Sequence, residues 1–264
     1  MGQMFYFHKR GLLTALLALV FIASLFSVNW GPDLIHNGGI TTMVQLAEGM
    51  VKPALSSEIL MLGLAASWKT LAYAATGMTL ALVLGLVFGV LASGVLFRKG
   101  RLRRAAKTIF RGLLGFMRAI HELVWAWLFV AAIGLSPLAA VFAIGIPYGG
   151  ILGRIFADML NDVPDEPVNS LKMSGASSLQ RLLYGYFPLA APDMVSYAFY
   201  RFECAVRSSA IMSFIGLGGL GFQIELSLHD LKYDEVWTFL YFLIALVILV
   251  DAWSRLVRGR LALW

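Results

Sequence analysis

The sequence has little of what enzymes and metalloproteins use. Only 14% of its 264 residues are charged, and it has one cysteine, Cys204. One cysteine cannot form a disulfide within the chain, and Cys204 gives no information on redox compartment because it lies in an apolar run. The four histidines are scattered, so we expect no metal site. No Ser/His/Asp order stands out, which leaves a membrane-embedded enzyme as a minor alternative without a site.

Nucleotide-binding motifs are absent or out of context. No G-x-x-x-x-G-K-S/T sequence occurs, so we expect no ATP site in this chain. Residues 216–221 match G-x-G-x-x-G, but a dinucleotide site needs a strand before this motif and a helix after it. Here the motif follows an apolar stretch long enough to cross a membrane. We therefore interpret it as a flexible or tightly turned loop.

Apolar residues dominate the composition. They make up 59% of the chain, and the mean hydropathy is +0.79. A soluble domain cannot bury that much apolar surface, whereas lipid can solvate it. We predict an all-α integral membrane protein with about six transmembrane helices, because the apolar runs have the length of helical spans and not of barrel strands. The predicted spans are residues 12–28, 68–97, 113–133, 138–158, 193–215 and 236–256.

The first apolar run has two interpretations. It follows a basic segment, His8-Lys9-Arg10, and this arrangement is shared by signal peptides and first transmembrane helices. No small-x-small cleavage site stands out after it, so we favour a transmembrane helix. A second local feature is the pair Gly85 and Gly89, whose spacing predicts close packing of helix backbones.

Basic residues predict the orientation. Placing both termini in the cytoplasm puts residues 1–10, 98–112, 159–192 and 257–264 on that side. Sixteen of the 21 Lys and Arg residues lie in or beside these segments: Lys9, Arg10, Arg98, Lys99, Arg101, Arg103, Arg104, Lys107, Arg111, Arg118, Arg154, Lys172, Arg181, Arg255, Arg258 and Arg260. The net charge of +6 therefore indicates a multi-pass protein oriented in a lipid membrane, with no nucleic acid as partner.

Ionisable residues inside the spans are the best candidates for a functional site, since they are costly in lipid and usually face a bundle interior or a water path. Glu203 and Arg207 are four residues apart and can pair on one helix face. Arg201 lies about 120° of helix rotation from Arg207, which leaves a spare positive charge. One interpretation is a salt-bridge network that orients helices, and the other is a path that favours anions. The predicted path residues are His121, Glu122, Arg201, Glu203, Arg207, Ser208 and Ser209.

Residues 160–192 form the longest polar interruption in the second half of the chain. A Pro-rich turn opens the segment, and Pro188 and Pro192 close it. Between them lies a short helical pattern interrupted by Gly175 and Ala176. We predict one or two short helices on the membrane surface, presented to a partner.

This segment resembles the "EAA" loop of ABC importer permeases, E-A-A-x-x-x-G-A followed by a later Pro. The matching run is Asn169-Ser-Leu-Lys-Met-Ser-Gly175-Ala-Ser177, with Pro188 thirteen residues after the glycine. Asn169 and Ser170 stand where the family pattern has Glu and the first Ala. The departure weakens any claim for a side-chain contact from position 169 and leaves the Gly-Ala turn intact.

Further motifs narrow the resemblance to the permease of phosphonate ABC importers. They are Arg118-Ala-Ile-His-Glu122, Ser196-Tyr-Ala-Phe-Tyr200-Arg-Phe-Glu203, Val206-Arg207-Ser208, Gly218-Gly-Leu-Gly221 and Tyr233-Asp-Glu235. The resemblance implies a type I ABC importer permease fold. It also implies an N-terminal part at 1–66, with one transmembrane helix and a periplasmic segment, and a permease domain at 67–260 with a cytoplasmic coupling loop at 160–192.

The resemblance further implies function and partners. The chain is expected to be a bacterial inner-membrane subunit that is not itself an enzyme and has no cofactor of its own. Two copies, two ATPase subunits that bind ATP and Mg, and a periplasmic binding protein would form the importer. The residues expected to contact the ATPase subunit are Asn169, Ser170, Leu171, Lys172, Gly175, Ala176 and Ser177.

Two alternatives stay open. Phosphite, hypophosphite or phosphate could replace phosphonate, because a separate binding protein usually sets the choice. An ion-gradient-driven transporter is less favoured, although His121, Glu122 and Glu203 could serve a proton relay. No inverted repeat of interrupted spans is evident to support it.

Overall fold

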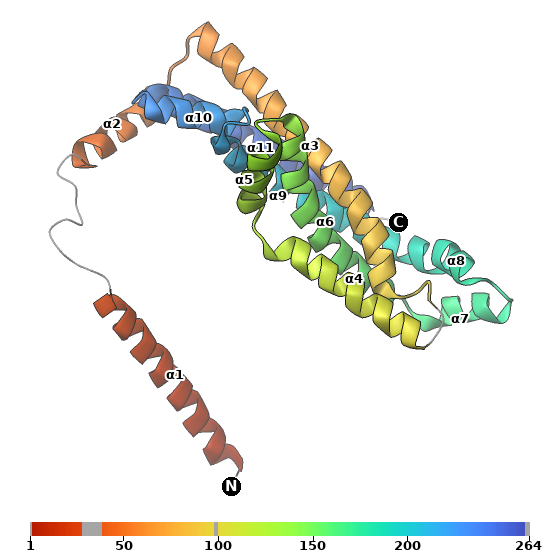
Figure 1. The fold of residues 1–264 in the computed structure, drawn as a ribbon. Coiled ribbons are helices and arrows are strands. Elements are labelled where there is room, and N and C mark those ends of the chain that lie inside the picture. The colour runs from red at the N-terminus through yellow and green to blue at the C-terminus, as the bar shows by residue number, and fades with distance from the viewer. Residues whose placement is uncertain (1, 28–38, 98–99, 262–264) are drawn as a thin grey trace. The chain divides into compact units, whose positions relative to one another are not determined.

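The computed structural model describes residues 2–27, 39–97 and 100–261, and every regular element in these ranges is helical (Figure 1). The prediction of an all-α protein is thereby confirmed. The elements are α1 (Gly2–Ser27), α2 (Gly39–Val51), α3 (Ser57–Ser93), α4 (Arg101–Ala119), α5 (Glu122–Ile133), α6 (Pro137–Asp162), α7 (Asp165–Met173), α8 (Ser178–Arg181), the π-helix η2 (Leu182–Tyr186), α9 (Phe187–Met212), the 3-10 helix η3 (Ser213–Ile215), α10 (Leu220–His229) and α11 (Tyr233–Leu261).

The chain divides into two compact units. Met1–Glu48 holds α1 and most of α2, and Gly49–Trp264 holds the remaining elements. The predicted span at 12–28 falls largely on α1, whose residues 11–27 form an apolar helix. Residue 28 lies outside the described residues, as do Arg98 and Lys99 of the predicted basic loop.

The described part of the chain has three to five candidate membrane spans, against about six predicted from the sequence. Within the described residues, α3, α6 and α11 are each long and apolar enough to cross a membrane. The pair α4 and α5 and the pair formed by 178–215 and α10 raise the number to five if each bent pair is one span. The shorter apolar helix at 11–27 is a further candidate.

The predicted span at 113–133 is not one helix. It is divided between α4 and α5, which meet at 85°, and the predicted basic loop at 98–112 is mostly the first part of α4. His121 produces the break: its backbone is extended and its Nδ1 accepts a hydrogen bond from the Leu123 N–H at 3.3 Å, which starts a new helix. The Trp125 indole N–H donates to the Met117 carbonyl at 3.3 Å and satisfies a group that the break leaves free.

Helices α3 and α6 form the centre of the second unit through small residues. A Cβ added to Gly89 would lie 2.9 Å from the Gly153 carbonyl oxygen, and one added to Gly85 would lie 2.8 Å from the Leu152 Cβ. Such contacts are closer than real Cβ atoms make. The predicted close packing at Gly85 and Gly89 is thus confirmed, and its partner is the Gly-rich face of α6.

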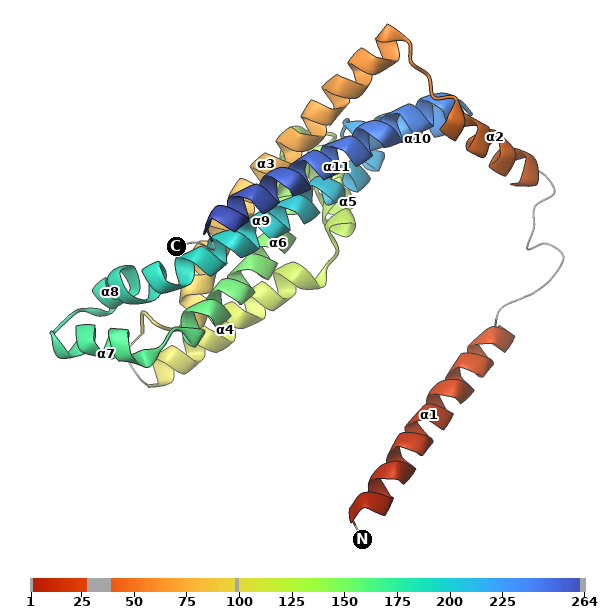
Figure 2. The ribbon, with the colours of Figure 1, turned by 180° about the vertical axis from the view of Figure 1, so that it is seen from behind.

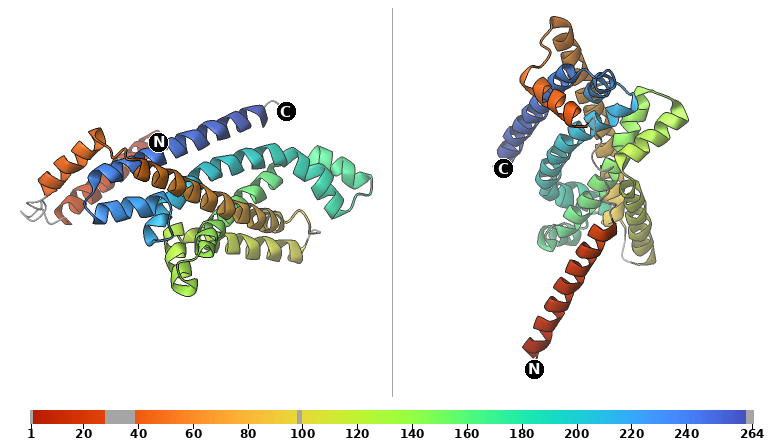
Figure 3. Two further views of the ribbon diagram at one scale, coloured as in Figure 1. Left: turned by 90° about the horizontal axis from the view of Figure 1, so that it is seen from above. Right: turned by 90° about the vertical axis from the view of Figure 1, so that its left-hand side faces the viewer.

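Helices α7 and α8 lie at one end of the second unit, and α10 lies toward the opposite end (Figures 2 and 3). The sequence predicted that Pro188 and Pro192 close the polar segment 160–192, and this prediction is wrong. Helix α9 begins at Phe187, and η2 joins it to α8 without a loop. Pro188 lies just after the wider π-helical turn of η2, and Pro192 lies within α9, so both prolines are part of one continuous helical run.

Candidate functional site

A chain of three polar side chains connects three membrane helices. The Ser208 hydroxyl in α9 donates to Glu122 Oε1 in α5 at 2.6 Å, and the Tyr148 hydroxyl of α6 lies 2.9 Å from Ser208 Oγ. A serine hydroxyl has one proton to donate. Since Ser208 gives its proton to the carboxylate, Tyr148 must donate to Ser208. The geometry therefore fixes a directed chain from Tyr148 through Ser208 to Glu122.

The break between α4 and α5 positions Glu122. This residue lies in the first turn of α5, where the helix dipole and free N–H groups favour a carboxylate. His121 Nε2 lies 3.6 Å from Glu122 Oε2, and the two side chains are 64% and 20% exposed. The carboxylate is thus partly screened from solvent, while the neighbouring imidazole is accessible. The structure brings together three predicted path residues: His121, Glu122 and Ser208.

Arg201 lies further along α9, toward α8, and is held by aromatic side chains. Its Nε donates to the Tyr197 hydroxyl at 2.8 Å, and its guanidinium lies 5.1 Å and 5.4 Å from the ring centroids of Tyr197 and Tyr200. Cation–π contacts of this kind stabilise a cation without neutralising it. None of the ion pairs in the described residues involves Arg201.

Glu203 does not pair with Arg207, contrary to the expectation from their spacing. Its Oε1 accepts a hydrogen bond from Arg258 Nη2 of α11 at 2.7 Å, so α11 supplies a stronger partner than the neighbouring turn. Arg207 is exposed and donates to Cys204 Sγ at 3.7 Å. Among the described residues it has no carboxylate within ion-pair distance. Helix α9 therefore carries two arginines whose charge no acid balances.

Ser209 has a packing position. It is fully buried, and its hydroxyl donates to the Thr70 carbonyl of α3 at 2.9 Å. The structure therefore places Ser209 in the α3–α9 interface, and its place in the path stays a prediction. Sequence reasoning missed Tyr148 and the role of Arg258, because their partners are 60 and 55 residues away. No local spacing rule relates residues on separate helices.

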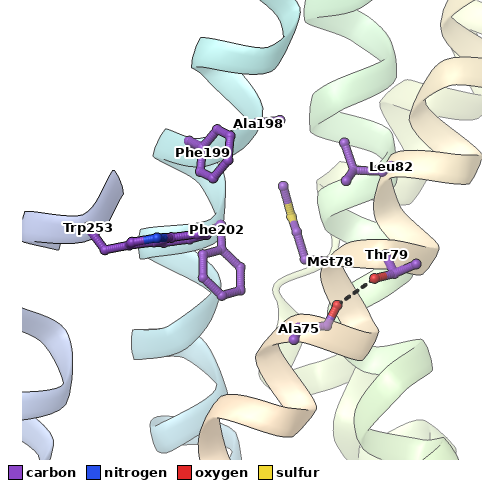
Figure 4. A pocket seen from close by; sticks show the side chains of 8 residues that line it. All are labelled: Ala75, Met78, Thr79, Leu82, Ala198, Phe199, Phe202 and Trp253. Carbon is purple, nitrogen blue, oxygen red and sulfur yellow. Dashed lines mark hydrogen bonds between the residues drawn. The ribbon is translucent and has the colours of Figure 1, made fainter. Parts of the chain in front are cut away.

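An apolar hollow of about 240 Å³ lies between α3, α9 and α11 (Figure 4). Met78, Phe199, Phe202 and Trp253 dominate its lining, and the two phenyl rings meet Trp253 edge to face. The one hydroxyl there, on Thr79, already donates to the Ala75 carbonyl at 2.8 Å. The hollow therefore holds no charged group, and the Trp253 indole N–H is the polar donor that its lining adds to the Thr79 hydroxyl.

The turn at Gly175 connects α7 to α8 by two successive capping motifs. The Ala176 N–H bonds to the Leu171 carbonyl at 3.0 Å and the Gly175 N–H to the Lys172 carbonyl at 3.1 Å, which is a Schellman motif. Gly175 has φ +85°, the left-handed conformation that this motif requires. Ser177 then begins α8 with a capping box, in which its hydroxyl and the Gln180 side chain satisfy each other's backbone N–H groups.

Helix α7 presents one face outward. Asn169, Ser170 and Lys172 are exposed, whereas Val168 is buried. Leu171 packs on η2: a Cβ added to Gly185 would lie 3.1 Å from Leu171 Cδ1. The predicted coupling residues thus divide into a polar exposed face and a turn fixed by backbone hydrogen bonds. Leu171 packs α7 against the continuous helix that η2 and α9 form.

Comparison with known proteins gives the family. The family described as "Binding-protein-dependent transport system inner membrane component" matches residues 85–262. The chain is 34% identical over 189 residues to the phosphite transport system permease protein PtxC of Stutzerimonas stutzeri, covering 72% of this chain and 67% of that protein. It is 28% identical over 214 residues to the phosphate-import permease protein PhnE of Mycolicibacterium smegmatis, covering 81% of this chain and 39% of that protein.

A solved structure shows the same fold. A chain of the MetNI methionine ABC transporter in an inward-facing conformation superposes with a TM-score of 0.67 at 23% identity, covering 78% of this chain and 99% of that one. The architecture is therefore that of a type I ABC importer permease. The family match extends across the α6–α9 polar chain and the α7–α8 segment. The chain belongs to the family of inner membrane components of binding-protein-dependent transport systems.

Proposed function

We propose that this chain is the permease of an ATP-driven importer of phosphonate or a related phosphorus oxyanion. The relatives named for phosphite and phosphate transport support this substrate class. The two arginines of α9 that no acid balances support an anionic substrate, since guanidinium groups match the geometry of tetrahedral oxyanions. Phosphite is the second candidate, because the relative named for it is 34% identical over most of its length.

The energy for transport comes from separate ATPase subunits. The exposed face of α7 is where we place their contact, through Asn169, Ser170 and Lys172. ATP and Mg would be bound by those subunits. A second copy of this chain would complete the path, and a periplasmic binding protein would deliver the oxyanion. Both termini, α7 and α8 would then lie on the cytoplasmic side.

The observation that carries the coupling mechanism is the continuous connection from α7 to the polar chain. The two capping motifs fix the angle between α7 and α8, and η2 joins α8 to α9 without an intervening loop. A push on α7 is therefore transmitted along α9 to Ser208, which holds Glu122. Movement of α9 relative to α5 and α6 would change the exposure of the arginines and so alternate access.

Transport by reconstituted protein tests the proposal. The permease, its ATPase subunit and its binding protein are assembled in liposomes, and uptake of phosphonate, phosphite and phosphate is measured with and without ATP. The proposal predicts ATP-dependent uptake of one of these anions and competition by the others at higher concentration. Uptake that survives ATP depletion and stops when the ion gradient collapses would instead establish a gradient-driven transporter.

A further inference from the structure

A basic cavity of about 990 Å³ lies beside the coupling segment, and Asn169 and Lys172 of the exposed face of α7 contribute to its lining. The turn after α3, the start of α4, helix α7 and helix α8 form its walls. Three basic side chains line it, Arg103 from α4, Lys172 from α7 and Arg181 from α8, together with one carboxylate, Asp165. The proposed transport path does not use this cavity, which belongs to the opposite end of α9 from Ser208.

The charges of this cavity are unbalanced. Among the described residues, none of the ion pairs includes Arg103, Lys172 or Arg181, and Asp165 pairs with none of them. By contrast, Arg111 lies further along α4 and pairs with Asp158 at 2.8 Å. Arg103 and Arg111 are thus both on α4, but only Arg111 has a carboxylate partner among the described residues.

Two donors in the cavity wall are buried and unsatisfied. The Nε atoms of Arg103 and Arg181 are inaccessible and have no hydrogen-bond partner, although Arg181 Nη2 donates to Ser178 Oγ at 3.0 Å. Buried donors without partners are uncommon in native proteins and indicate a missing water, ion or ligand. Here both occur on cations that come from different helices and line the same space. An acceptor carrying negative charge would satisfy both donors and balance the excess positive charge of the cavity.

We propose that this cavity binds a phosphate group, with Arg103, Arg181 and Lys172 as its ligands. A phosphate supplies several strong acceptor oxygens and balances the excess charge. Ser177 and Asn169 add polar groups to the wall. The group is carried by a free phosphorus oxyanion or by an anionic lipid headgroup, which share this chemistry. If the proposed function holds, a free oxyanion here would be the imported product, bound beside the segment that couples ATP hydrolysis to transport.

Binding is measured on the full chain alone, in nanodiscs of zwitterionic lipid, by calorimetric titration with inorganic phosphate at constant ionic strength. Chloride serves as the blank. The test variant is R103Q/R181Q, and the matched control is R101Q/R104Q, which removes the same charge from exposed residues of α4 outside the cavity. Lys172→Gln is a second test variant that keeps the fold, because this side chain is exposed.

We expect phosphate to bind saturably to the wild type and to the control. The affinity for phosphate should fall about tenfold or more in R103Q/R181Q and by a smaller factor in K172Q, because charge-assisted hydrogen bonds are lost. A second arm uses phosphatidylglycerol nanodiscs without phosphate and measures thermal stability. If the anionic lipid raises the melting temperature of the wild type and the control but not that of R103Q/R181Q, the bound phosphate group belongs to a lipid headgroup.

The proposal is overturned if neither phosphate nor anionic lipid binds, or if the control loses binding as much as the test variants. The readout requires no ATPase subunit, binding protein or transport. A wild-type chain that binds neither phosphate nor anionic lipid but supports oxyanion uptake in the complex would therefore refute this site alone. A wild-type chain that binds but supports no uptake would refute the proposed function alone.

Discussion

Replacing Gly175 tests whether the turn after α7 transmits force. Its φ of +85° is left-handed, and a Cβ built there has nothing within 4 Å. Gly175→Ala therefore causes no clash, and its effect is confined to the backbone. The left-handed conformation costs a non-glycine residue about 1–2 kcal/mol, which lowers the equilibrium ratio of native to non-native turn by a factor of about 5–30. Gly175→Asn should cost less, because asparagine tolerates this conformation.

The assay is ATP hydrolysis by the reconstituted complex, stimulated by loaded binding protein. We expect coupling to fall strongly in Gly175→Ala and mildly in Gly175→Asn, with membrane insertion unchanged in both. Gly115→Ala is the control, since Gly115 lies within α4 and a Cβ there also has nothing within 4 Å. Wild-type coupling in Gly175→Ala, or an equal loss in Gly175→Asn and Gly175→Ala, would show that the turn conformation is not what transmits the movement.

Three further predictions concern the membrane helices. Gly89→Ala should destabilise the protein by about 1–3 kcal/mol, because the new Cβ meets the Gly153 backbone, and thermal unfolding in detergent checks this. Arg258→Gln leaves the Glu203 carboxylate, only 12% exposed, without its partner and should lower stability by about 1–3 kcal/mol. The double variant with Glu203→Gln should recover most of that loss, and no recovery would show that the pair is not coupled. Arg207→Gln should reduce oxyanion uptake with unchanged stability, because the side chain is exposed and has no carboxylate partner among the described residues; wild-type uptake would exclude it from the path.

Features that depend on local chemistry could be predicted from the sequence. Apolar run length indicated the spans, and the Gly-Ala pair at 175–176 indicated a turn between short helices, as the Schellman motif shows. The Gly85 and Gly89 spacing likewise indicated close packing. Each of these signals lies within one continuous stretch of the chain, so a single sequence carries it.

Features that depend on contacts between helices could not be predicted. The i,i+4 rule favoured a Glu203–Arg207 pair, but it says nothing of Arg258, which reaches Glu203 from α11. The break at His121 was missed because the residues of the run 113–133 are mostly apolar and contain no Pro, while the extended backbone at Ile120 and the histidine cap of α5 are seen only in the structure. Tyr148 lies in an apolar run, and its hydrogen bond to Ser208 depends on how α6 packs against α9.

The measurement that tests the central claim most directly is ATP hydrolysis by this permease in liposomes with its candidate ATPase subunit. Binding protein is added empty, or loaded with phosphonate or phosphite. The account predicts that hydrolysis rises only with loaded binding protein, and the more effective ligand names the substrate. A folded permease that does not associate with the ATPase subunit, or hydrolysis that is indifferent to the loaded binding protein, would contradict it.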